Sequence, residues 1–207
     1  MGNMHLVTGY LGQEHIMATD QAAFNAAMMG TGQVVFGSGK MLQAQIISNN
    51  QIRVLDGELM MQGRFVRLDP GTYVDLAIEN GTQGLKRNDL IVARYTKNTV
   101  TGVEAADLVV IKGSAVERNP VDPEHTEADT TNGAAAQHDF PLWRIPLDGL
   151  NVGNPVALFG EPFTDSMQTL PDMRKTVNRI YDNLDNTLDE FVQANTMTVE
   201  QVNEICN

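Results

Sequence analysis

The chain has 207 residues, a formal net charge of −12 and a hydrophobic content of 42%. This length permits one medium domain or two small ones, and this hydrophobic content is enough to form a buried core. The excess of negative charge opposes contact with a phosphate backbone, so we do not expect a nucleic-acid partner. The single cysteine, Cys206, excludes an intrachain disulfide and a paired-cysteine metal site.

Targeting and membrane signals are absent from the sequence. The N-terminal residues MGNMHLVTGYLGQEHI contain neither the basic region nor the apolar region of a signal peptide. No apolar run approaches the ~20 residues that a membrane helix requires. We therefore expect a protein that is made and assembled in a cytoplasm without membrane contact.

A short helix is expected near the N-terminus. Thr19 is a good N-cap, Asp20 lies at the positive end of the helix dipole, and Gly30 supplies a residue that can end the helix. The residues between them are mostly alanine and methionine. This face either packs against a sheet, which is the simpler interpretation, or forms a docking surface.

The central part of the chain predicts antiparallel β-structure. Strand-like runs cover Gln45–Ser48, Gln51–Leu55, Glu58–Gln62, Arg64–Leu68, Thr72–Ile78, Asp89–Thr96, Asp107–Lys112 and Phe140–Leu147. Asn49-Asn50 suits the two-residue turn of a hairpin, and Asp69-Pro70-Gly71 has the composition of a turn. Because no helix of crossover length separates the runs, a parallel sheet is not expected.

Residues 113–139 form a long polar segment inside this β region. The segment contains two prolines, six acidic residues and almost no bulky apolar side chain. Such a composition cannot bury enough apolar surface to offset its ordering entropy. We expect an exposed loop that is dispensable for folding and available as an assembly contact.

The last part of the chain predicts helix. An apolar stripe recurs at spacings of three and four residues through Met173, Val177, Ile180, Leu184, Leu188 and Phe191. Thr198 and Gln201 form a capping box for a final short helix. The expected fold is therefore mainly β, with a short N-terminal helix and C-terminal helices. It divides into an N-terminal arm (1–33), an antiparallel β domain (34–152), a linker (153–169) and a C-terminal helical segment (170–207).

Catalytic and metal-binding motifs were not found. His5, His15, His125 and His138 show no metal-ligand spacing, and the acidic loop lacks the pattern of a calcium-binding loop. Gly37-Ser38-Gly39-Lys40 fails the spacing of a phosphate-binding loop. We expect no enzyme activity, no cofactor and no bound metal.

Several blocks of the sequence resemble structural proteins from the tail tips and baseplates of phages and prophages of Gram-positive bacteria. The blocks are Ile46–Val54, Asp56–Arg64, Ile78–Gly84, Arg87–Tyr95, Thr101–Glu104, Leu108–Gly113 and Phe140–Ile145. The likeness extends over about Gly9 to Val152. The likeness is to structural proteins, and it implies no catalytic residues in this chain.

The resemblance implies a virion component, assembled in the bacterial host cytoplasm, that contacts copies of itself and neighbouring tail or baseplate proteins. Such a subunit can serve as an adaptor that anchors a receptor-binding protein. The six residues of the C-terminal stripe are the expected interface. The alternative is a carbohydrate-binding module for host recognition, although Trp143, the single tryptophan, is expected to pack in the core.

Overall fold

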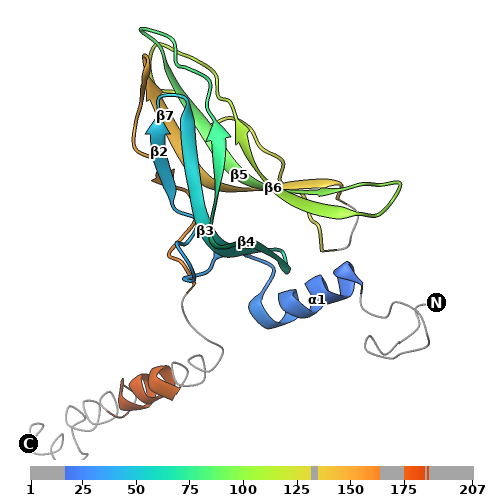
Figure 1. The fold of residues 1–207 in the computed structure, drawn as a ribbon. Coiled ribbons are helices and arrows are strands. Elements are labelled where there is room, and N and C mark those ends of the chain that lie inside the picture. Colours follow the sequence, from blue (N-terminus) through green and yellow to red (C-terminus); the bar gives the residue numbers. More distant parts are fainter. Residues whose placement is uncertain (1–16, 132–134, 164–174, 185, 187–207) are drawn as a thin grey trace, which may run out of the picture. The chain divides into compact units, whose positions relative to one another are not determined.

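The computed structural model describes residues 17–131, 135–163, 175–184 and 186. The chain forms two compact units, Met1–Thr164 and Asp165–Asn207. The first unit contains the β domain, and the second contains the C-terminal helix, which covers residues 175–184 (Figure 1).

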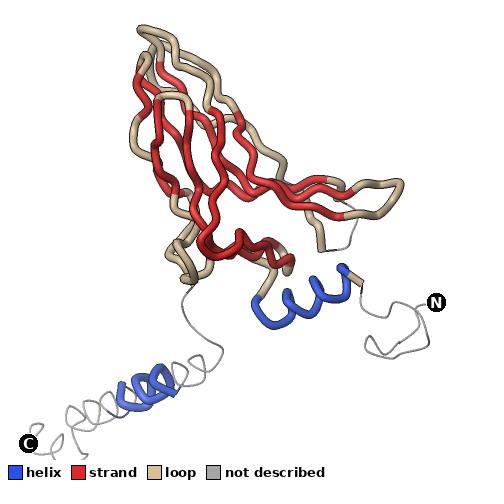
Figure 2. The backbone as a smooth tube through the Cα atoms, in the orientation of Figure 1, coloured by secondary structure: helices blue, strands red, loops and turns tan. Residues whose placement is uncertain are grey.

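Within its described residues, the first unit has one helix followed by nine strands, and Figure 2 shows the helix and strands along the backbone. The elements are α1 (Ala18–Met29), β1 (Gln33–Val35), β2 (Ala44–Ser48), β3 (Gln51–Met61), β4 (Arg64–Ala77), β5 (Lys86–Lys97), β6 (Glu104–Ile111), β7 (Gln137–Asp148), β8 (Asn151–Val152) and β9 (Val156–Ala157). All pairs between these strands are antiparallel, and residues 46–111 contain no helix. The predicted fold class is confirmed.

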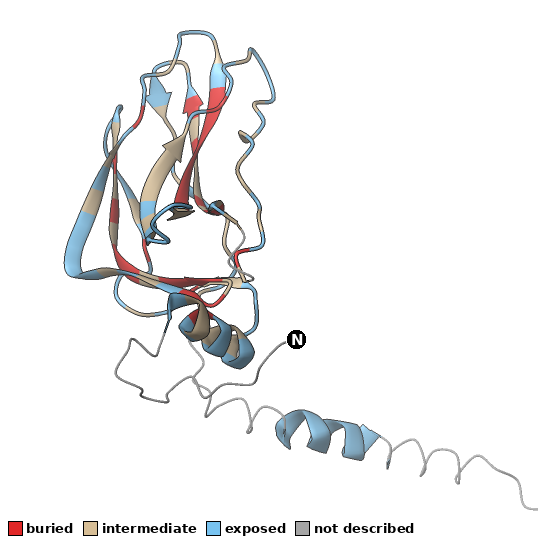
Figure 3. Cartoon of the chain, turned by 90° about the vertical axis from the view of Figure 1, so that its right-hand side faces the viewer, coloured by how far each residue is buried: buried red, intermediate tan, exposed pale blue. Residues whose placement is uncertain are grey.

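The strands form two sheets that share one hydrophobic core. In the first sheet β3 pairs with β4 along one edge and with β1 and β2 along the other. In the second sheet β5 lies between β6 and β7, and β7 also pairs with β8 and β9. The fully buried side chains of both sheets are mostly aliphatic, and Figure 3 shows the buried residues within the strands.

The hairpin between β2 and β3 turns at Asn49-Asn50, as predicted. The turn expected at Asp69-Pro70-Gly71 is wrong, because β4 continues through these residues. Leu68 lies opposite Gly57 and Tyr73 lies opposite Leu55. Residues 69–72 of β4 therefore lie opposite a single residue of β3, Asp56. This is a β-bulge, and Pro70 is tolerated there because β4 is an edge strand within its sheet.

Helix α1 begins earlier than predicted, with Met17 rather than Thr19 as its N-cap. The Asp20 carboxylate accepts a hydrogen bond from the Met17 backbone N–H (3.3 Å), which satisfies a free donor of the first turn. Gly30 ends the helix with a φ of +87°, as expected. The small residue Ala22 faces the β domain and is buried, whereas Phe24 is 62% exposed.

Beyond Val152 the chain still belongs to the β domain. Strand β9 pairs with Trp143 and Arg144 of β7. Phe163 donates its N–H to the Val35 carbonyl (2.7 Å), and the Gly37 N–H donates to the Phe163 carbonyl (2.8 Å). The structure therefore places residues 153–163 of the expected linker on the β domain.

The contact between α1 and the β3–β4 turn predicts a sharp response to substitution at Gly63. A Cβ atom there would lie 2.1 Å from the Ala22 carbonyl oxygen, and Gly63 also has a φ of +82°. We expect Gly63→Ala to lower the free energy of unfolding by more than about 2 kcal/mol, measured by chemical denaturation.

The matched control is Gly71→Ala. Gly71 has a similar φ of +75°, but a Cβ atom there meets no atom within 4 Å. Gly71→Ala should lower the free energy of unfolding by only about 1 kcal/mol, because it introduces backbone strain without a steric clash. Equal losses in the two variants would contradict the close packing of α1.

Candidate functional site

The C-terminal helix carries the described part of the predicted interface. Val177, Ile180 and Leu184 lie on one side of it and are 48%, 58% and 56% exposed. The other three predicted interface residues, Met173, Leu188 and Phe191, lie outside the described residues. All described residues of this helix are coloured as exposed in Figure 3.

Tyr181 adds a fourth large side chain to this face and was missed from the sequence. It is 63% exposed and follows Val177 by four residues, which places the two side chains next to each other on the helix. This spacing of four residues could have identified Tyr181 from the sequence. We call Val177, Ile180, Tyr181 and Leu184 the C-terminal stripe.

The polar segment that follows β6 is the largest departure from expectation. Residues 113–131, here called the strap, run as extended chain along one side of the β domain (Figure 1, yellow-green to yellow). Val116 exchanges two backbone hydrogen bonds with Lys86 of β5 (2.6 and 2.8 Å). Asp122 accepts hydrogen bonds from Arg144 of β7 (2.6 Å) and from the Asn88 amide (3.0 Å). The segment is a loop with many exposed residues, as expected, but these hydrogen bonds hold it against the β domain.

Three alternate amides of the strap donate to side chains of the β domain. Thr126 N–H donates to Asp139 Oδ2 (2.9 Å), Ala128 N–H to His138 Nδ1 (3.1 Å) and Thr130 N–H to Gln62 Oε1 (2.6 Å). Thr130 is fully buried as a result. Polar contacts rather than apolar burial hold this segment, which removes the physical reason for expecting it to be dispensable.

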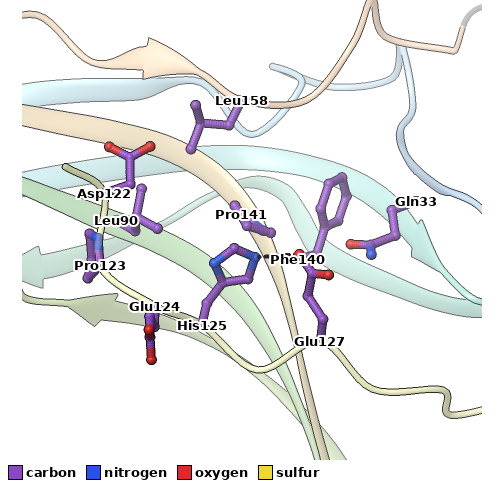
Figure 4. Close-up of a pocket in the computed structure, with 10 residues that line it drawn as sticks. All are labelled: Gln33, Leu90, Asp122, Pro123, Glu124, His125, Glu127, Phe140, Pro141 and Leu158. Carbon is purple, nitrogen blue, oxygen red and sulfur yellow. Dashed lines mark hydrogen bonds and ion pairs between the residues drawn. The ribbon is translucent and has the colours of Figure 1, made fainter.

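A cavity of about 670 Å³ lies between the strap and strands β5 and β7. Figure 4 shows that its polar groups come largely from the strap. Most are already paired: Asp122 binds Arg144, and His125 lies 3.2 Å from Glu127. Among the described residues, no group of three or more histidine, cysteine or acidic side chains could hold a metal ion.

A second cavity, of about 650 Å³, lies beside Trp143. Trp143 is half-buried, packs against the hydrophobic core and donates its indole N–H to the Leu42 carbonyl (2.9 Å). Phe159 contacts it edge to face, with ring centroids 5.4 Å apart. The expectation that Trp143 packs on the core is met, yet one side of it also lines this cavity.

No protein-family model and no curated protein matches the chain. In the part of the chain that the structure describes, no helix combines the length and apolar character needed to span a membrane.

The strap predicts a pH dependence of stability through His138. Its imidazole is buried, and burial lowers its pKa more than the neighbouring Asp139 and Glu127 raise it. An unfolded histidine binds a proton near pH 6.5, so the unfolded state binds more protons below that pH. The free energy of unfolding should therefore fall as the pH drops from about 7 to 5, measured by urea denaturation.

One variant separates His138 from other groups. His138→Gln keeps an acceptor for the Ala128 N–H but cannot take up a proton, so its stability should be nearly flat across this range. A His138→Gln variant with the full wild-type slope would exclude His138 as the source.

Proposed function

We propose that this protein is a structural or adaptor component of a phage tail or baseplate that assembles through subunit contacts and can anchor a host-binding protein. The observation that carries the proposal is the C-terminal stripe, four large apolar side chains that are each about half exposed or more. A contiguous apolar face of this kind marks a surface that a partner covers. Its spacing of three and four residues suits the packing of helix on helix.

The resemblance to tail-tip and baseplate proteins supports the same function. Its first blocks, Ile46–Val54 and Asp56–Arg64, fall on strands β2, β3 and the start of β4. The block Arg87–Tyr95 falls on β5, at the centre of the second sheet. The similar sequence thus coincides with paired strands, as expected for a likeness that concerns a scaffold.

Charge and exposure agree with an assembling subunit. A net charge of −12 keeps free subunits apart until specific apolar contacts form. Helix α1 also exposes large apolar side chains, among them Phe24 and Met28, on the side opposite Ala22. We assign the assembly role first to the C-terminal stripe, with copies of the same chain as its partner.

The test replaces two residues of the stripe in the full-length protein. Ile180→Asp with Leu184→Asp places two charges on the apolar face, and burying unpaired charge is strongly unfavourable. We expect the wild-type protein to be an oligomer by multi-angle light scattering and the double variant to have the mass of a single chain.

The matched control makes the same change of −2 in net charge on the opposite side of the helix, as Arg179→Asp. Its mass should equal that of the wild type, because Arg179 lies neither three nor four residues from any member of the stripe. A monomeric wild-type protein, or a double variant that keeps its mass, would contradict assembly through the stripe.

The alternative function, a carbohydrate-binding module, requires an accessible aromatic ring beside free polar groups. The exposed Tyr73 does not meet this requirement. The Arg53 guanidinium lies over its ring, 3.5 Å from the centroid, and is itself held by two hydrogen bonds to Asp75. Tyr73 is thus occupied within its own sheet.

A further inference from the structure

The cavity beside Trp143 combines a strained turn with aromatic side chains. Met41 and Leu42 are consecutive non-glycine residues with φ values of +54° and +53°. Such residues are uncommon and persist only where the surrounding structure fixes them. Here the Asp56 carbonyl accepts hydrogen bonds from the Lys40 and Leu42 N–H groups (3.0 and 3.2 Å).

The strained turn also fixes the tryptophan. Because Leu42 is held in this conformation, its carbonyl can accept the Trp143 indole N–H (2.9 Å). The ring therefore has no free hydrogen-bonding group, and a ligand can meet only its apolar surface. Phe159 and Pro162 extend that apolar surface along the cavity.

Three polar side chains line the same cavity and are free. The side chains of Lys40, Gln43 and Glu161 have no hydrogen-bond or ion-pair partner among the described residues. All three are exposed. Together they supply an ammonium donor, an amide that both donates and accepts, and a carboxylate acceptor.

We propose that this cavity binds a neutral saccharide ring. The positive charge of Lys40 and the negative charge of Glu161 balance each other, which favours a ligand without net charge. Hydroxyl groups donate and accept, so they match all three polar side chains. The apolar face of a pyranose ring can pack on Trp143 and Phe159. This binding activity gives the alternative function, a carbohydrate-binding module, a specific site, and it does not depend on the assembly role.

The single tryptophan makes the site directly observable. The full-length protein would be titrated with methyl α-D-glucopyranoside, methyl β-D-galactopyranoside and N-acetylglucosamine. Trp143 emission and the one indole N–H resonance in a ¹⁵N spectrum report on the site. We expect a saturable change in both signals with at least one sugar, at about millimolar concentration. No response in either signal to any of the three at about 100 mM would overturn the proposal.

A pair of variants tests whether the response comes from this cavity. Gln43→Ala removes a free amide from the lining, whereas Gln45→Ala removes an exposed amide from the neighbouring strand β2. Gln43→Ala should weaken binding about fivefold, and Gln45→Ala should leave it unchanged. Equal effects would place the sugar elsewhere.

Charged analogues test the class of ligand. Glucuronate and glucosamine should bind no more tightly than the neutral sugars, because the two opposite charges of the lining cancel. Tighter binding of either analogue would overturn the assignment to a neutral ring.

Discussion

The buried guanidinium of Arg64 joins the separate parts of the β domain. This side chain of β4 is 8% exposed, and it donates two hydrogen bonds to Glu104 of β6 (3.1 and 3.2 Å). It donates a third to Thr130 of the strap (2.9 Å). Because an uncompensated buried charge is strongly destabilising, all these partners must be in place at once. The position of the strap follows from this requirement.

The same hydrogen bonds connect the ionisation of Glu104 with the packing of one sheet against the other. Burial tends to raise the pKa of Glu104, but the hydrogen bonds from Arg64 hold it below its ordinary value. Glu104 therefore stays ionised and keeps β6 next to β4, although the two strands belong to different sheets. Although the chain has many acidic residues, a few of them, each in an ion pair with one arginine, hold the strands in place.

The sheets could be predicted from the sequence because their signals are local. Alternating apolar residues and the Asn49-Asn50 turn mark the hairpins without reference to the rest of the chain. The bulge opposite Asp56 could not be distinguished from a turn, since both use proline and glycine and differ only in strand register. The strap was missed for a related reason. Its partners are distant in sequence, as Thr130 and Gln62 show, and composition alone does not reveal them.

The two candidate sites likewise differ in how far the local sequence predicts them. The C-terminal stripe was predicted because helical periodicity is a property of neighbouring residues, and the structure adds Tyr181 to it. The cavity beside Trp143 depends on a hydrogen bond between residues 101 positions apart, Trp143 and Leu42, and on a left-handed turn that no local motif predicted. Sequence therefore predicted the helical surface, and only the tertiary structure assembles the cavity.

Amide hydrogen exchange in the native protein tests the central structural claim most directly, that the strap is an integral part of the β domain. The amides of Thr126, Ala128 and Thr130 each donate to a side chain of the β domain. They should exchange about as slowly as the central amides of β5, through global unfolding. Exchange of all three at the rate of free exposed amides would contradict this account.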